Sequence, residues 1–206
     1  MEEKKTYTQE ELNDILKEAR LSLTGDMGRK RSFSEAERLY RIAAENGQID
    51  AQFELGDLYF RGTGIALNYA EAIKWYRKAA DGGHAEAQCS LGYCYQNEIG
   101  VEQSYEEAYK WFRLSAEGGS AEGMYCVGYC YEMGEGVDVD FDEAIRWYRR
   151  SADDGFGLAY YSLAGCYRYG VGVEQSIPKA IEYYEIAMEK DVPGAETELK
   201  KLKKNR

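Results

Sequence analysis

Residues 87–112 read AQCSLGYCYQNEIGVEQSYEEAYKWF, and closely similar stretches recur along the chain. The period is 36 residues, because successive tryptophans stand 36 positions apart at Trp75, Trp111 and Trp147. Three further columns keep the same step: Ala51, Ala87, Gly123, Ala159 and Ala195; Leu55, Leu91, Val127, Leu163 and Leu199; and Tyr59, Tyr95, Tyr131 and Tyr167. A fixed period of this length is typical of proteins built from stacked structural repeats.

Each repeat is predicted to contain two amphipathic helices, called helix A and helix B here. In helix A the apolar positions 51, 55, 58 and 59 have the spacing of one buried helix face. In helix B the positions 69, 72, 73, 76, 79 and 80 form a second apolar stripe. A single unit cannot cover both stripes, so the sequence predicts an all-α solenoid of about five stacked helix-turn-helix repeats.

The start of helix B carries a repeated capping box, in which the first side chain and a Glu three residues later each accept a backbone N–H. The copies are Ser32/Glu35, Asn68/Glu71, Ser104/Glu107 and Asp140/Glu143, while the fifth copy, Ser176/Lys179, keeps only the cap. Left-handed glycines are expected after helix B, at Gly47, Gly83, Gly119 and Gly155, and in the A–B loop, at Gly64, Gly100, Gly136 and Gly172.

The unbroken period predicts one solenoid domain over residues 1–206. Residues 12–47 would form a degenerate first repeat, and residues 48–83, 84–119, 120–155 and 156–191 would form regular repeats. Residues 192–206 would form a capping helix whose outer face is rich in lysine.

Composition narrows the function. The chain has 26 basic and 37 acidic residues and a net charge of −11, which argues against nucleic-acid binding. The sequence as given has no signal-peptide pattern and no apolar run near the roughly 20 residues that a membrane span needs, so we expect a cytoplasmic protein without membrane insertion. The five cysteines form no C-x-x-C pair and His84 is the one histidine, so we expect no disulfide framework, metal site or cofactor.

The segment from Ala87 to Tyr95, together with Gly100-Val101, Glu107-Ala108 and Trp111-Phe112, resembles the Sel1-like repeat family. That family is related to tetratricopeptide repeats, whose period is 34 residues. The resemblance covers residues 12–205. It implies a right-handed α/α superhelix that acts as an adaptor or scaffold for protein complexes.

One branch of that family is secreted, has a disulfide in each repeat and includes members associated with β-lactam binding. The present sequence departs from that branch, because helix B supplies no cysteine to pair with Cys94, Cys130 or Cys166. Residues 176–179 match the S-x-x-K motif of β-lactam-binding enzymes, but the companion motifs are absent and Ser176 falls in the helix-cap column. We therefore expect no enzymatic activity, and a β-lactam-binding or hydrolase-like activity is the alternative.

Other side chains receive structural interpretations. Cys94, Cys130 and Cys166 are expected to be buried like small apolar residues, and the tryptophan column is expected to stack between repeats. Cys89 and Cys126 lie off the core columns and are expected to be exposed thiols. His84 is expected to be an ordinary surface residue.

The candidate binding surface is the other face of helix A. Columns 53, 57 and 60 share one helix face and point away from the buried stripe. They hold Phe53, Asp57 and Phe60; Cys89, Tyr93 and Gln96; Tyr125, Tyr129 and Glu132; and Tyr161, Gly165 and Arg168. Large aromatic residues at such positions are typical of recognition surfaces, although they could also fill gaps between helices. We predict that a partner protein or peptide with basic flanks lies along this surface, which would line the concave side.

Overall fold

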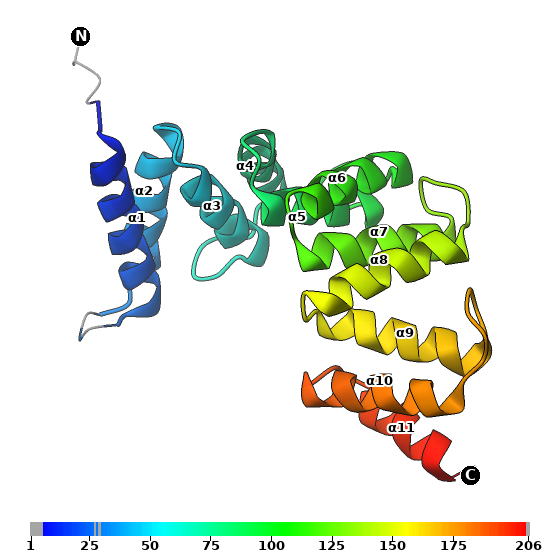
Figure 1. The fold of residues 1–206 in the computed structure, drawn as a ribbon. Coiled ribbons are helices and arrows are strands. Elements are labelled where there is room, and N and C mark those ends of the chain that lie inside the picture. Colours follow the sequence, from blue (N-terminus) through cyan, green and yellow to red (C-terminus); the bar gives the residue numbers. More distant parts are fainter. Residues whose placement is uncertain (1–5, 27, 29, 205–206) are drawn as a thin grey trace. The chain divides into compact units, whose positions relative to one another are not determined.

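The computed structural model describes residues 6–26, 28 and 30–204. This part of the chain folds into eleven α-helices (Figure 1): α1 Gln9–Thr24, α2 Phe33–Glu45, α3 Ile49–Arg61, α4 Tyr69–Asp81, α5 Ala85–Gln96, α6 Tyr105–Glu117, α7 Ala121–Met133, α8 Phe141–Asp153, α9 Gly157–Tyr169, α10 Ile177–Glu189 and α11 Ala195–Lys204. Odd-numbered helices correspond to helix A and even-numbered helices to helix B. The predicted all-α fold of repeated helix pairs is confirmed, and α11 lies within the predicted capping segment, whose last two residues are outside the described part.

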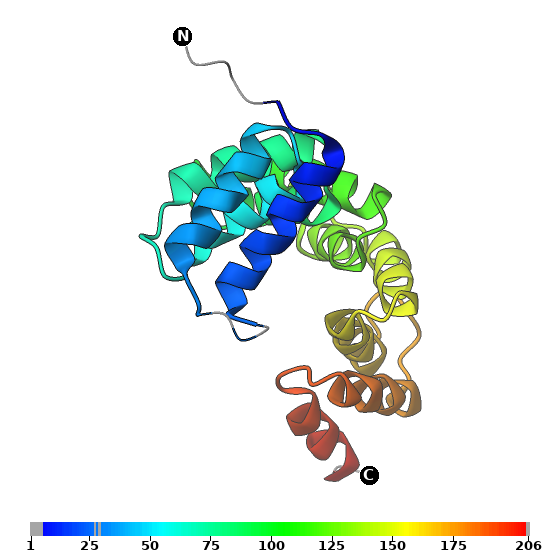
Figure 2. The ribbon, with the colours of Figure 1, turned by 90° about the vertical axis from the view of Figure 1, so that its left-hand side faces the viewer.

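The helices form two compact units, Met1–Gln103 with α1 to α5 and Ser104–Arg206 with α6 to α11. Within each unit every helix packs against the helix that precedes it and the helix that follows it along the chain (Figures 1 and 2). Such nearest-neighbour packing is the arrangement of a repeat protein. No helix of the described residues is both long and apolar enough to cross a membrane.

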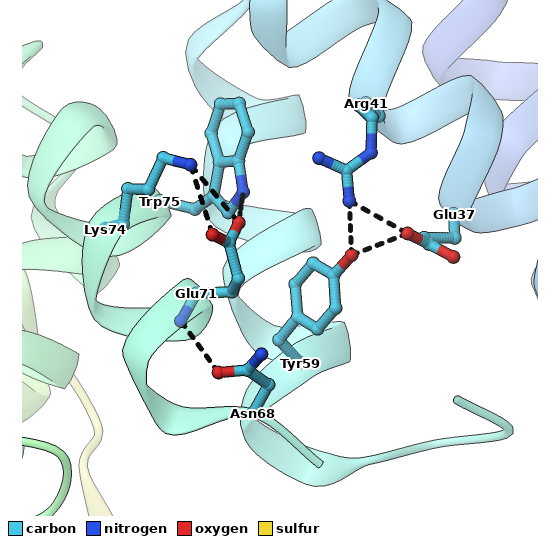
Figure 3. A network of polar contacts seen from close by, with 7 residues as sticks. All are labelled: Glu37, Arg41, Tyr59, Asn68, Glu71, Lys74 and Trp75. Carbon is cyan, nitrogen blue, oxygen red and sulfur yellow. Dashed lines mark hydrogen bonds and ion pairs between the residues drawn. The ribbon is translucent and has the colours of Figure 1, made fainter. Parts of the chain in front are cut away.

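The predicted capping of helix B is confirmed for the cap side chain but not for the Glu three residues later. The side chains of the five predicted caps each accept from the backbone N–H three residues on. The reciprocal bond to the Glu was wrongly predicted, and at Ser32, Asn68 and Asp140 the backbone N–H of the cap residue already donates to a backbone carbonyl oxygen. Asn68 N donates to Tyr59 O of the preceding helix at 3.0 Å. Glu71 instead accepts from Lys74 Nζ and Trp75 Nε1, each at 3.1 Å (Figure 3).

The loop glycines are needed for two reasons. All eight predicted left-handed glycines have φ between 63° and 89°. At Gly136, where φ is 74°, a Cβ would also lie 2.2 Å from the carbonyl oxygen of Tyr105, the first residue of α6. At Gly64 a Cβ would lie 2.0 Å from the ring of Phe33, the first residue of α2. The A–B loop of one repeat thus packs against the start of helix B in the repeat before it.

The core follows the predicted columns. Leu55, Leu91, Val127 and Leu163 are fully buried, one in each regular repeat. The close approach of helices A and B depends on a second set of glycines. A Cβ on Gly128 would lie 2.7 Å from the ring of Tyr148, and a Cβ on Gly56 would lie 2.6 Å from the ring of Tyr76. These tyrosine rings therefore take the place of a side chain on the facing helix.

The tyrosine column ties helix B of one repeat to helix A of the next. In Figure 3, the Tyr59 hydroxyl donates to Glu37 at 2.5 Å and accepts from Arg41. Arg149 donates to the Tyr167 hydroxyl at 3.0 Å in the same register. At the C-terminal end the corresponding residues are Glu185 and Lys203, which form an ion pair of 2.7 Å. The contact between the two helices is thus kept, but the cation now comes from helix A, as Lys203, and not from helix B. By this contact α11 continues the repeat as a helix A.

Three further sequence predictions were wrong, and they concern the cysteines off the core columns, His84 and Trp111. Cys89 and Cys126 are buried and not exposed, because a thiol ends close to the backbone and cannot reach past longer neighbours. His84 is not an ordinary surface residue. It is the N-cap of α5, its side chain is 15% exposed, and its Nδ1 accepts from Ala87 N at 3.3 Å. Trp75 and Trp147 are buried as predicted, but Trp111 is only half-buried.

The buried cysteine column leads to a prediction about reactivity and pH. Burial raises the pKa of the Cys94, Cys130 and Cys166 thiols from 9.0 to about 12. Because the thiolate is the nucleophile, we expect Ellman's reagent to label the native chain at pH 8 far more slowly than the urea-unfolded chain. Equal labelling rates would contradict this prediction.

The raised pKa of these thiols also determines how the stability of the chain changes with pH. The unfolded thiols ionise first, since their pKa is lower, so their contribution to stability is complete below about pH 9 and is lost between about pH 9 and 12. The free energy of unfolding, measured by urea titration, should therefore fall over that range. A Cys130→Ala variant should lose less of its stability over the same pH range.

Candidate binding surface

The first predicted triplet lies on α3. The Phe53 ring stacks on His84 with 4.6 Å between centroids and lies 5.9 Å from Tyr76. The Phe60 ring lies 5.4 Å from Tyr69 and 5.9 Å from Tyr76. Both phenylalanines are half-buried in contacts with α4 and the start of α5, so much of their surface fills the space between helices.

The other predicted residues of the N-terminal unit, Asp57, Tyr93 and Gln96, have polar groups that a partner can contact. Asp57 forms an ion pair of 2.7 Å with Arg61 and accepts from the Tyr76 hydroxyl at 3.4 Å. Tyr93 on α5 is 51% exposed, and Gln96 lies half-buried on the same helix. Tyr93 thus presents an aromatic ring to solvent where the sequence predicted one.

In the C-terminal unit, α7 carries the third triplet. The Tyr125 ring lies 5.5 Å from Tyr148 and 5.3 Å from Phe156, and burial raises its pKa. Tyr129 is half-buried, and burial also raises its pKa. Glu132 accepts a short hydrogen bond from the Tyr148 hydroxyl. The core residue Tyr148 thus holds a carboxylate of the predicted surface.

The fourth triplet, on α9, borders a surface pocket of about 410 Å³. The pocket opens where the column that holds Asp57, Tyr93 and Tyr129 has Gly165 instead. The nearest atom to a Cβ built on Gly165 is the Tyr184 hydroxyl, 4.0 Å away, so the space beside this glycine is open. The residues that line the pocket include Glu132, Tyr161, Gly165, Tyr169, Tyr184 and Glu198. The structure therefore brings together three predicted residues: Glu132 of column 60, Tyr161 of column 53 and Gly165 of column 57.

Arg168 does not line this pocket. It forms an ion pair with Glu198, which also pairs with Lys201 at 2.6 Å, and the two cations hold the pKa of Glu198 below its usual value. Tyr169, Tyr184 and Glu198 are pocket residues that the sequence did not single out. The one sequence signal for the pocket was Gly165, a residue without a side chain among larger neighbours in its column.

The S-x-x-K segment has a structural explanation. Ser176 is the N-cap of α10, and its Oγ accepts from Lys179 N at 3.5 Å. Lys179 Nζ lies 4.9 Å from the centroid of the Tyr167 ring. Both residues are accounted for by helix capping and by a cation–π contact.

Comparison with known proteins agrees with the repeat. The profile of the Sel1 repeat matches five consecutive segments, residues 19–48, 49–84, 85–120, 121–156 and 157–192. The first matched segment is shorter than the other four. A search of curated proteins found no match.

Solved structures show the same architecture. A Sel1 repeat protein from Oxalobacter formigenes is 34% identical, with a TM-score of 0.87 over 91% of this chain and 74% of that chain. A protective antigen with an SLR fold from uropathogenic Escherichia coli is 30% identical, with a TM-score of 0.83 over 94% of this chain. The present chain spans only 43% of that antigen.

A more distant likeness extends to an immunity protein from Pseudomonas aeruginosa. It is 21% identical, with a TM-score of 0.61 over 92% of this chain and 69% of that chain. At this identity the likeness shows the fold alone. The five matched segments and the two closer structures together establish the family: this chain belongs to the Sel1 repeat family.

Proposed function

We propose that the chain is a non-catalytic scaffold that binds a partner polypeptide through the outward sides of α3 and α5 in the N-terminal unit and of α7 and α9 in the C-terminal unit. We call these residues together the helix-A surface, and they are Phe53, Asp57, Phe60, Tyr93, Gln96, Tyr125, Tyr129, Glu132, Tyr161, Gly165 and Arg168. The observation that carries the proposal is the pocket beside Gly165, because it combines three of these positions in one recess. Concave sites with a few polar groups among aromatic rings are typical of binding sites.

Charge and exposure support the same proposal. Tyr93 is 51% exposed, and an exposed tyrosine offers a large apolar ring together with a hydroxyl that can form hydrogen bonds. The net charge of −11 favours a partner with basic flanks, because complementary charge speeds association and selects against acidic partners.

The relatives support the fold more than the role. By their names, one is a protective antigen and another is an immunity protein. One fold therefore carries different named roles, and function has to be argued from the surface and not from the architecture. The residues of the helix-A surface differ from repeat to repeat, and one column holds Asp57, Tyr93, Tyr129 and Gly165.

The test removes two aromatic side chains from the helix-A surface. We expect a Tyr93→Ala/Tyr129→Ala variant to capture its partner at least about tenfold more weakly than the natural chain, because a truncated aromatic anchor commonly costs more than 1 kcal/mol. The measurement is quantitative affinity capture followed by a binding titration with the captured protein. Circular dichroism and urea unfolding should show that the variant keeps its fold.

The matched control removes two exposed apolar side chains from helix B. Leu114 on α6 and Met188 on α10 are 44% and 40% exposed, and a Leu114→Ala/Met188→Ala variant should bind like the natural chain. Equal loss in both variants, or in neither, would contradict binding through the helix-A surface. Labelling by a fluorescent β-lactam that disappears in Ser176→Ala would contradict the non-catalytic part of the proposal.

A further inference from the structure

The pocket beside Gly165 has aromatic walls. The rings of Tyr161 and Tyr184, from α9 and α10, meet edge to face with 5.3 Å between centroids. Tyr169, near the end of α9, is 66% exposed and borders the same pocket. The face of a tyrosine ring carries partial negative charge and attracts cations.

The pocket also contains a carboxylate without a cationic partner. Glu132 is half-buried and accepts one hydrogen bond, from the Tyr148 hydroxyl. Among the described residues, no Lys or Arg forms an ion pair with it. Glu198, which also lines the pocket, is already paired with Arg168 and Lys201. A partly buried carboxylate beside aromatic rings is most favourable when a cation reaches it.

Gly165 keeps this space open. It lies in the middle of α9, where a glycine weakens a helix relative to alanine. A side chain there would meet no atom nearer than 4.0 Å at its Cβ, so packing does not require the glycine. A larger residue, such as the tyrosine that two other repeats have in this column, would extend into the pocket.

We infer that this pocket receives a lysine or arginine side chain of the partner polypeptide, with its charged end at Glu132 and its stem against Tyr161 and Tyr184. This inference rests on the proposed function and specifies the chemistry that the helix-A surface recognises. The acidic net charge of the chain agrees with a basic anchor. The pocket, at about 410 Å³, is large enough for one long side chain.

The test uses small mimics of the basic side chains and needs no partner. Butylammonium and butylguanidinium are titrated into the ¹⁵N-labelled full chain, with the uncharged n-butanol as the comparison probe. We expect saturable amide shifts centred on Gly165 and its neighbours with both cations, and none with the alcohol. Shifts of equal size with the alcohol, or no saturable shift with the cations, would overturn the inference.

Four variants sharpen the result. Glu132→Gln keeps the shape and removes the charge, and it should weaken binding of the cations about tenfold or more. Glu182→Gln makes the same charge change at an exposed position of α10 and should leave the affinity within about twofold. Gly165→Tyr should abolish the saturable shifts, while Gly165→Ala should retain them and report that the fold tolerates a side chain. Unchanged binding in Glu132→Gln would also overturn the inference.

The two proposals can fail separately. Loss of partner capture in the Tyr93→Ala/Tyr129→Ala variant without any binding of the cations would leave the helix-A surface as the binding site and remove the basic anchor. Saturable binding of the cations with unchanged partner capture would support the pocket and contradict the wider surface.

Discussion

Replacing Gly128 with alanine should lower the free energy of unfolding by about 1–3 kcal/mol, because the added methyl group overpacks a filled site. The Cβ would lie 2.7 Å from the Tyr148 ring and 3.1 Å from the Ala144 carbonyl oxygen. Tyr148 is fully buried and packs in the core of the C-terminal unit, so its ring has little room to move. The helices α7 and α8 would have to separate.

Gly165→Ala is the matched control, because both glycines lie inside a helix A of the same unit. Here the Cβ meets no atom nearer than 4.0 Å, and the expected result is a gain of about 0.5–1 kcal/mol from helix propensity. Urea unfolding followed by circular dichroism measures both variants. A gain of stability in Gly128→Ala as well would mean that the packing of Tyr148 on Gly128 is looser than the structure indicates.

Much of the fold could be predicted, because the repeat shows each structural position several times. The apolar columns gave the helix pairs, and the glycine columns gave the turns. The predictions that were wrong concern single residues in single repeats, which the repeat pattern does not determine. Cys89 stands in a column of aromatic residues but is too short to reach the surface. His84 stands in a cap column, which the pattern of Gln48 and Ser120 at the same position could have indicated.

The capping box shows a different limit. The spacing of Asn68 and Glu71 is compatible with a reciprocal pair, and sequence alone cannot tell which acceptor the N–H of the cap residue will find. In the folded chain the carbonyl of Tyr59 is that acceptor, so Glu71 is free to bind Lys74 and Trp75. A contact within the repeat, between helix A and the start of helix B, decided the local hydrogen bond.

The candidate site could be predicted as a face but not as a pocket. The spacing placed Tyr161, Gly165 and Arg168 on one face of a helix. Periodicity predicts such a shared face but not the shape of the surface around it. The pocket also needs Tyr184 from α10 and Glu198 from α11, which occupy different columns. Which positions of a face stay open depends on the length of every neighbouring side chain, and columns of residue types do not carry that information.

The tryptophan column gives the second large effect. Trp75→Ala should lower the free energy of unfolding by about 3–5 kcal/mol, the usual cost of truncating a buried aromatic residue. Trp75 is 1% exposed, its Nε1 donates to Glu71, and Lys78 Nζ lies 4.0 Å from the ring centroid (Figure 3 shows the bond to Glu71). Removing the ring would leave a cavity and release both polar partners.

Two controls separate these contributions. Trp75→Phe keeps most of the packing and loses one hydrogen bond, which should cost about 1 kcal/mol for the bond itself. Trp111→Ala should cost less than Trp75→Ala, because Trp111 is half-buried. Equal losses at the two tryptophans would show that burial does not set the cost in this column.

The Trp75→Ala substitution should also destabilise the helices near it more than distant ones. Because α4 packs on α3 and α5, amide hydrogen exchange in Trp75→Ala should accelerate first in these three helices. Within the other unit, α9, α10 and α11 pack on their own neighbours along the chain and should exchange at their original rates. Uniform acceleration from α2 to α11 would instead require that the repeats unfold as one cooperative block, and the nearest-neighbour description of the packing would then be insufficient.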